Sequence, residues 1–207
     1  MEYKVEIGGV TYGMEKIQSV SIEHPLFDKL SVGNACSAEL EISFWPTETV
    51  PRMAMIIPYC RESSADEWYQ LGVFYTDTRS LRNGIMTLVA YDAMLKSDTV
   101  WEPDQDLVFP MTMTEAVTEI ISLMGVELDS RTVLKTGDDY VIDYPANDYT
   151  LRDVLRFIAA ANAGNWIITD AGKLLLVPLF SSMPTETNYL VTEDGDAITF
   201  GGVRILV

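Results

Sequence analysis

The sequence is poor in the residues from which metal sites, disulfide frameworks and catalytic triads are built. Its 207 residues include one histidine, His24, and two cysteines, Cys36 and Cys60. Neither cysteine belongs to a CxxC pair, so we predict that both thiols are buried and act as small hydrophobic side chains. A lone histidine with no nucleophile beside it in sequence is more often structural than catalytic. We therefore expect neither a metal site nor a catalytic triad.

Long hydrophobic runs are also absent. No apolar segment approaches the roughly 18 residues that a membrane-spanning helix needs, although 48% of the residues are hydrophobic, as in an ordinary globular protein. A chain of this length can bury about 70% of its unfolded surface and so form a core without metal or disulfides. The N-terminal residues alternate as in a strand and do not resemble a secretory leader, so we expect synthesis and folding in the cytoplasm.

Positive charge is scarce, with 14 Lys and Arg against 31 Asp and Glu and a net charge of −17. Residues 1–98 hold 14 acidic and 8 basic side chains, and residues 99–207 hold 17 and 6. So acidic a surface repels phosphate backbones, and we expect no sequence-specific binding of nucleic acid. Solubility is the simplest explanation of this charge. The alternative is an acidic wall along which DNA passes without binding.

The short motifs of common enzymes are missing as well, since the chain has no HExxH, Walker or GxGxxG sequence. Asp138, Asp139, Asp143 and Asp148 lie among tyrosines, a composition that would suit the paired carboxylates of a glycosidase. With 31 acidic residues, solvated loops explain this clustering more simply. Asp194–Asp196 lacks the further oxygen ligands of an EF-hand loop. We therefore assign no catalytic, cofactor-binding or metal-ligating residue.

Alternating side chains and tight-turn signals describe the first half of the chain. Residues 71–94 read as two strands joined at Asn83-Gly84, because both residues tolerate the positive φ of a type I′ turn. A Gly-Gly pair within residues 2–12 predicts a second hairpin. The clearest strand is 36–44, where apolar and polar side chains alternate, so one face is packed and the other is wet.

Further strands are predicted at residues 19–23 and 50–59, and residues 24–35 read as a loop. Five or six short antiparallel strands favour a small barrel or sandwich. We take residues 1–98 as an N-terminal antiparallel β-barrel.

Two amphipathic helices are predicted in the second half. Thr112 with Glu115, and Thr150 with Asp153, have the spacing of a capping box, in which each side chain satisfies a backbone donor of the first turn. Gly125 is placed to end the first helix in the left-handed region. The expected buried stripes are Ala116, Val117, Ile120, Ile121 and Met124 in the first helix, and Leu151, Val154, Leu155, Ile158 and Ala161 in the second.

A third hairpin is predicted over residues 165–177, so residues 99–178 read as a compact α+β domain with two helices on a small sheet. Residues 179–207 contain strand-like pieces that either complete the first barrel or begin a second, incomplete one. In the second case the chain would be the N-terminal part of a longer protein. The predicted fold class is α+β, mainly β.

The order of these elements resembles a known family. It is carried by the segments VEIGGVTY, SVSIEHPLFDKLSVGNACSAELEISF, VPRMAMIIPY, WYQLGVFYTDTRSLRNGIMTLVAYDAMLK, TMTEAVTEIISLMGVEL and YTLRDVLRFIAAANAGNWIITDAGKLLLVPL. Together they resemble the phage tail hub proteins, which include the baseplate hubs of contractile tails and the hub region of tail-associated proteins in prophages of Gram-positive bacteria. The resemblance covers nearly the whole chain and rests on no catalytic residue.

The resemblance implies a β-barrel domain, an α/β domain and a second barrel, with three copies forming a ring at the tail tip through which DNA leaves. It implies a homotrimer in contact with a tail-tube or distal tail protein, no cofactor, no membrane insertion and a place in the virion tail after synthesis in the host cytoplasm. The chain departs from the family after Leu179, where too few residues remain for a complete second barrel.

We therefore expect a structural tail-tip protein, not an enzyme, that forms a ring continuing the tail tube. The alternative is a carbohydrate-binding or adhesin module that recognises a surface through its tyrosines and tryptophans. A cell-wall hydrolase using the acids from Asp138 to Asp148 is the third and weakest hypothesis.

Overall fold

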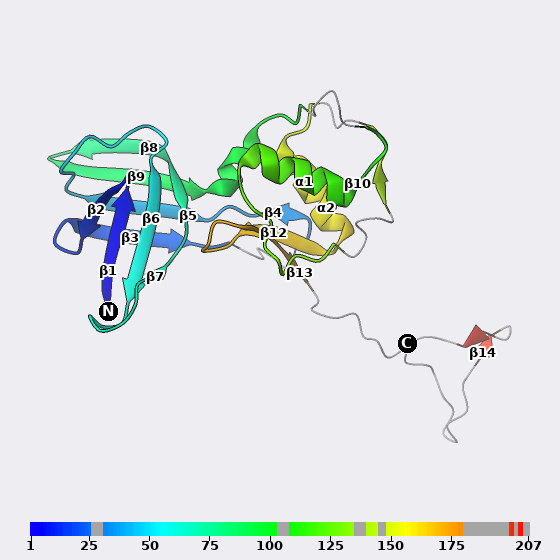
Figure 1. Cartoon of the computed structure of the whole chain (residues 1–207), viewed down its shortest axis with the longest axis horizontal. Helices are drawn as coiled ribbons and strands as arrows, with labels where there is room; N and C mark the ends of the chain where they lie inside the picture. Colours follow the sequence, from blue (N-terminus) through cyan, green and yellow to red (C-terminus); the bar gives the residue numbers. More distant parts are fainter. Residues whose placement is uncertain are drawn as a thin grey trace, which may run out of the picture.

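The computed structural model describes residues 1–25, 31–102, 108–134, 140–144, 148–179, 199–200 and 203–204. The described chain is elongated, with an antiparallel sheet at one end and two helices on a smaller sheet at the other (Figure 1). Asp138, Asp139 and Asp194–Asp196 lie outside the described residues. Near the C-terminus, β14 (Thr199–Phe200) and β15 (Val203–Arg204) form a short antiparallel pair.

The large sheet has the strand order β2-β1-β6-β8-β9-β5-β3, and β7 also pairs with β6. Every pairing along this path is antiparallel, as the alternating sequence predicted. The strands are β1 (Glu2–Ile7), β2 (Val10–Gly13), β3 (Ile17–Glu23), β5 (Glu39–Phe44), β6 (Met55–Arg61), β7 (Tyr69–Gln70), β8 (Phe74–Arg82) and β9 (Ile85–Asp92).

The predicted turns of this sheet are confirmed. Asn83 and Gly84 have φ of 52° and 80° between β8 and β9, as a type I′ turn requires. The β1–β2 hairpin also turns at its predicted Gly-Gly pair. On β5, Leu40, Ile42 and Phe44 are fully buried and alternate with more exposed side chains, so the inward face was read correctly.

The large sheet curls around one core, but its paired strands do not close into a barrel. The hydrogen-bonded path ends at β2 on one side and at β3 on the other, and no ladder joins β3 to β1 or β2 within the part of the chain that is described. Apolar side chains from β1, β3 and β6 line the seam between them instead. The closed barrel expected from the sequence is therefore not confirmed. Strand alternation shows which face is buried, but it does not specify whether the first and last strands meet.

The second unit places two helices on a three-stranded sheet of order β13-β12-β4 (Figure 1). Its core is separate from that of the large sheet and centres on Trp166, Leu155 and Ile120. The α+β, mainly β fold class is confirmed. Its elements are η2 (Ala93–Asp98), β10 (Met111–Thr112), α1 (Met113–Met124), β11 (Val141–Ile142), α2 (Leu151–Ala161), β12 (Gly164–Ile168) and β13 (Leu174–Pro178).

Both helices begin with the predicted capping boxes. The Thr112 hydroxyl accepts from the backbone N–H of Glu115 at 3.1 Å, and the Glu115 carboxylate accepts from the backbone N–H of Thr112 at 2.7 Å. Thr150 and Asp153 repeat this arrangement at the start of α2. Gly125 follows α1 with φ of 62°, as expected of a left-handed helix end.

A short strand that the sequence did not predict joins the two units. Residues 24–35 read as a loop, yet β4 (Asn34–Ala35) pairs in parallel with β12, about 130 residues further along the chain. Gly33 allows this approach: its φ is 83°, and a Cβ there would lie 2.9 Å from the Cβ of Ala160 on α2. The N-terminal half thus supplies a strand to the second sheet. The division at residue 98 stays a prediction.

Candidate functional site

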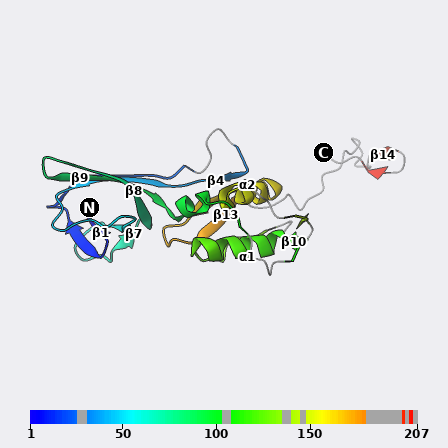
Figure 2. The same cartoon turned by 90° about the horizontal axis from the view of Figure 1, so that it is seen from above.

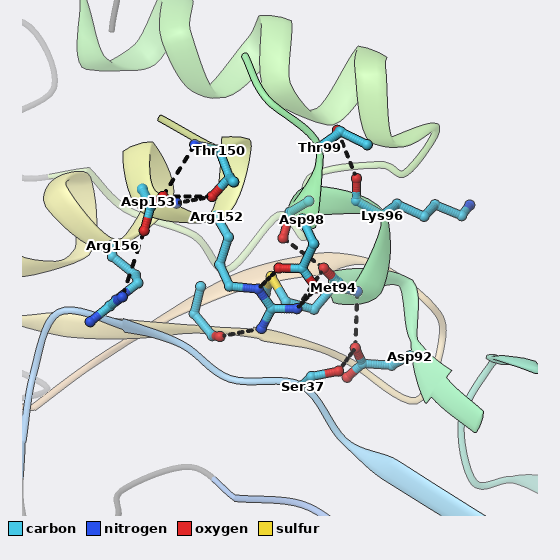
Figure 3. Close-up of polar contacts among 12 residues, drawn as sticks. Ser37, Asp92, Met94, Lys96, Asp98, Thr99, Thr150, Arg152, Asp153 and Arg156 are labelled. Atoms are coloured by element: carbon cyan, nitrogen blue, oxygen red, sulfur yellow. Dashed lines mark hydrogen bonds and ion pairs between the residues drawn. The ribbon is translucent and has the colours of Figure 1, made fainter. Parts of the chain in front are cut away.

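A buried polar cluster lies where the large sheet meets the helices (Figure 3). Asp92, the last residue of β9, is only 3% exposed. Its carboxylate accepts hydrogen bonds from the backbone N–H of Ala38 at 2.7 Å, the hydroxyl of Ser37 at 3.0 Å and the backbone N–H of Met94 at 2.9 Å. Through the last of these bonds Asp92 caps η2. The side chain therefore fixes the turn by which the chain leaves the sheet.

Burial raises the pKa of the Asp92 carboxyl above its ordinary value. The three hydrogen bonds and the charge of Arg152 act in the opposite direction, but burial remains the largest effect. Both carboxylate oxygens are engaged by donors from the protein itself. This arrangement suits a structural role better than proton transfer to a substrate.

Arg152 of α2 forms the second part of the junction. Its guanidinium binds both carboxylate oxygens of Asp98 and donates to the backbone carbonyls of Ala35 and Met94, each at 3.0 Å. One planar side chain thus connects α2, β4 and η2 (Figure 3). The bidentate geometry is specific to arginine, because a lysine ammonium cannot present two parallel N–H donors.

A second contact joins the units on the side of β7. The Tyr69 hydroxyl donates to the Asp170 carboxylate at 2.7 Å, and the Gln70 side-chain amide donates to the Asp170 backbone carbonyl. Asp170 lies in the turn between β12 and β13. The two units are therefore held together at two separate points.

The hollow beside the junction tests the enzyme hypothesis. It has a volume of about 200 Å³ and is lined in part by His24, Cys36 and Asp92, the residue types of a cysteine–histidine site. Burial, however, raises the pKa of the Cys36 thiol, Arg152 lowers it, and Asp92 raises it further. The reactive thiolate is thus disfavoured at neutral pH. With Asp92 engaged elsewhere, the hollow lacks the features of an activated nucleophile.

The cysteines differ from the prediction in one respect. Cys36 and Cys60 are partly exposed and not fully buried, and neither forms a disulfide. Of the acids proposed for a sugar cleft, Asp143 and Asp148 are exposed. Across the described ranges, no group of three or more His, Cys, Asp or Glu is placed to hold a metal ion. No helix in those ranges is long and apolar enough to cross a membrane.

Two exposed segments at the ends of the packed units carry charged and large apolar side chains on the surface. The first is the arm, which we define as residues 77–89 of the β8–β9 hairpin. β6 pairs with β8 only at Phe74 and Tyr75, so beyond Thr76 the outer edge of β8 has no strand partner among the residues described. All of β8 from Asp77 to Arg82 is exposed.

The second exposed end is the acidic tip, which we define as residues 140–144 and 148–149, around β11. Its large side chains are exposed, with 79% for Tyr144 and 60% for Tyr140. Asp143 and Asp148 add two exposed carboxylates. The two ends lie at opposite ends of the two packed units, as the positions of β9 and β10 indicate in two views (Figures 1 and 2). β10 is the strand partner of β11. The sequence grouped Asp143 and Asp148 with tyrosines but did not identify the arm, because the exposure of a strand depends on which strands lack neighbours.

Three solved structures share this fold. The 43 kDa tail protein of prophage MuSo2 from Shewanella oneidensis matches with a TM-score of 0.60 and 13% identity, over 90% of this chain and 58% of that one. A tail protein from Neisseria meningitidis MC58 matches with a TM-score of 0.56 and 12% identity, over 92% of this chain and 55% of that one. The prophage tail protein gp18 from Listeria monocytogenes EGD-e matches with a TM-score of 0.51 and 10% identity, over 93% of this chain and 55% of that one. The chain therefore has the fold of phage and prophage tail proteins.

The chain spans a little over half the length of these three proteins. No protein-family model matches the sequence, and no curated protein is significantly similar to it. At 10–13% identity the likeness establishes the fold alone.

Proposed function

We propose that this protein is a structural, non-catalytic component of a phage or prophage tail. More narrowly, we propose that it is a baseplate hub whose copies form a ring, with three as the expected number, that continues the tail tube. The observation that carries the proposal is the likeness to three tail proteins from different bacteria, each covering at least 90% of this chain. The Asp92 and Arg152 contacts support it, since they serve the fold and, among the residues described, leave no convergent reactive groups at the junction.

The surface charge and the open sheet are consistent with a ring. An excess of 17 negative charges lets a polyanion pass without strong binding, because attractive phosphate contacts would add up to tight, salt-dependent affinity. The seam beside β3 has a volume of about 240 Å³ and includes Val20 and Ile22, which are partly exposed. An unpaired strand edge next to an apolar seam offers a surface for lateral association, which cyclic symmetry closes into a ring.

The ring is tested by measuring mass and shape in solution. Light scattering after size exclusion should give a trimer mass, alone or with a purified phage tail-tube protein, and negative-stain images should show hollow rings. Ile22→Lys should abolish the ring, because a charge then occupies the seam. Ser21→Lys, an exposed neighbour on the same strand, should preserve it. A monomer under all these conditions would refute the hub assignment.

One observation favours the adhesin alternative, namely the exposed tyrosines of the acidic tip. Aromatic rings can stack on sugars, and Tyr144 is the most exposed of the large aromatic side chains described. Trp68 supports this alternative less well, because Arg61 lies 4.3 Å and Lys4 5.1 Å from its ring centroid. Pull-down with purified bacterial cell walls separates the hypotheses: an adhesin would be retained and would lose retention in Tyr144→Ala.

A further inference from the structure

We propose that copies of this protein associate end to end, with the arm of one copy against the acidic tip of the next. The contact would involve surfaces other than the seam of the proposed ring. It does not depend on the tail assignment.

The arm has a net positive charge in a strongly acidic protein, since it holds two arginines and one carboxylate, that of Asp77. Arg79 and Arg82 lie on its exposed strand, and neither has a carboxylate within ion-pair distance among the residues that the structure describes. Arg79 donates one hydrogen bond to the backbone carbonyl of Val50. Two unneutralised guanidinium groups on a protein of net charge −17 form a specific site of attraction for carboxylates.

Apolar surface accompanies these charges. Leu81, between the two arginines, is 60% exposed. A hollow of about 410 Å³ opens next to it between the arm and the loop before Val50. Charged groups around exposed apolar side chains are the usual composition of a protein contact, in which the apolar part supplies affinity and the charges supply register. The lining of the hollow includes Arg79, Leu81 and Met86 of the arm and Glu48 and Val50 of the facing loop.

The acidic tip is complementary in both respects. Asp143 and Asp148 supply carboxylates, and neither has an ion pair in the described part of the chain. Tyr140 and Tyr144 supply exposed apolar area with polar ends. A second copy of the chain is therefore the occupant that charge complementarity favours, since each copy carries both halves of the contact.

The placement of the two ends determines the kind of assembly. The arm and the tip lie at opposite ends of the two packed units, separated along the long axis (Figures 1 and 2). A contact between two different surfaces at opposite ends of an elongated molecule is heterologous when the copies are stacked along the long axis, and such stacking does not close the assembly. Each added copy leaves one free arm and one free tip. The association should therefore continue beyond a dimer as concentration rises.

The test uses charge exchange between the two ends. The arm variant is Arg79→Gln with Arg82→Glu, and the tip variant is Asp143→Lys with Asp148→Asn; asparagine tolerates the φ of 68° at position 148. Sedimentation velocity at low salt should show reversible association of the wild type. Each variant alone should associate at least about tenfold more weakly, a change of about 1.4 kcal/mol. An equal mixture should regain association, because the arm and tip of each variant complement those of the other.

Two control variants that also reverse an exposed charge test whether any change of surface charge has the same effect. Glu62→Lys, directly after β6, and Arg131→Glu, which is paired with Asp129, change exposed charges outside the arm and the acidic tip and should leave association unchanged. Association should also weaken in about 1 M salt, where the Debye length is about 3 Å. A wild type that stays monomeric, variants that associate normally, or a mixture that stays dissociated would each overturn the proposal. The proposal would also be overturned if the wild type bound bacterial cell walls and the tip variant lost this binding while it still associated with itself.

Discussion

Asp92 shows how a single buried side chain determines the course of the chain. It collects donors from residues 37, 38 and 94 while it is nearly inaccessible to water. A buried carboxylate is tolerated only when hydrogen bonds replace its hydration. The same bonds fix β9, η2 and the segment that leads into β5, so the residue acts on structure at a distance of more than 50 positions in sequence.

We predict that Asp92→Ala is strongly destabilising. Removal of the carboxylate leaves two buried backbone N–H groups and one hydroxyl without their acceptor, and we expect a loss of about 2–4 kcal/mol in the free energy of unfolding. Urea denaturation followed by circular dichroism measures it. Ser37→Ala, which removes only one donor to the same carboxylate, should cost about 1 kcal/mol. Equal costs for the two variants would contradict this role.

Two aspartates should give stability opposite dependences on pH. Burial raises the pKa of Asp92, so its contribution is present below the unfolded-state pKa and is lost as pH rises through the folded-state pKa. Hydrogen bonds from Arg131 lower the pKa of Asp129 to about 2, so its contribution is present above the unfolded-state pKa and is lost as pH falls toward about 2.

Urea denaturation across this pH range should separate the two effects. Asp92→Asn should reduce the loss of stability as pH rises, and Arg131→Gln should reduce the loss of stability as pH falls. Carbon-detected NMR titration of the two carboxyl groups checks the directions directly. A folded-state pKa of Asp92 below its unfolded-state value would reverse the first expectation.

At the scale of elements, β4 depends on one close approach. Gly33 lies against α2, where the nearest atom to an added Cβ would be the Cβ of Ala160 at 2.9 Å. Its φ of 83° also lies in a region that residues with a Cβ seldom adopt. Both the strand pairing and the contact with the helix therefore require glycine at this position.

We predict that Gly33→Ala costs about 2–3 kcal/mol, because it combines backbone strain with a steric clash. Gly84→Ala is the matched control. That residue has a similar φ of 80° but nothing within 4 Å of an added Cβ, so its cost should be limited to about 1 kcal/mol of strain. Thermal unfolding compares the two. Adding Ala160→Gly should recover part of the loss in Gly33→Ala, and the absence of recovery would show that the helix contact is not its cause.

For the whole molecule, β4 and the hydrogen bonds of Asp92 couple two separate cores, and Arg152 anchors β4 and η2 to α2. The core of the large sheet and the core around the helices share no buried residue, yet Ala35 of the second core comes from the N-terminal half. Such coupling should make the described fold behave as one cooperative unit. The contact between Tyr69 and Asp170 strengthens the link on another side.

We predict that differential scanning calorimetry of the wild type gives one unfolding transition and that Arg152→Ala gives two. The substitution removes the bidentate pair with Asp98 and two hydrogen bonds to backbone carbonyls, so α2 loses its polar anchors to β4 and η2, the two segments that connect the large sheet to the second core. Arg156→Ala, on the same helix but exposed and weakly paired with Asp153 at 3.6 Å, should keep a single transition. Two transitions in the wild type would show that the units unfold independently.

The sequence by itself determined the local elements. The β8–β9 hairpin follows from Asn83-Gly84, and both helix starts follow from threonine three residues before an acidic side chain, because these signals act between residues a few positions apart. The inward face of β5 follows from period-2 alternation.

Only the tertiary structure decided how these elements meet. The pairing of β4 with β12, the targets of Arg152 and the unclosed seam all join residues that are distant in sequence. Their formation depends on shape complementarity and on which backbone groups remain unpaired after the local elements form, and no short-range pattern encodes either. The exposure of the arm and the acidic tip was decided in the same way, since a strand edge or an aromatic ring is free only when the rest of the fold leaves it uncovered.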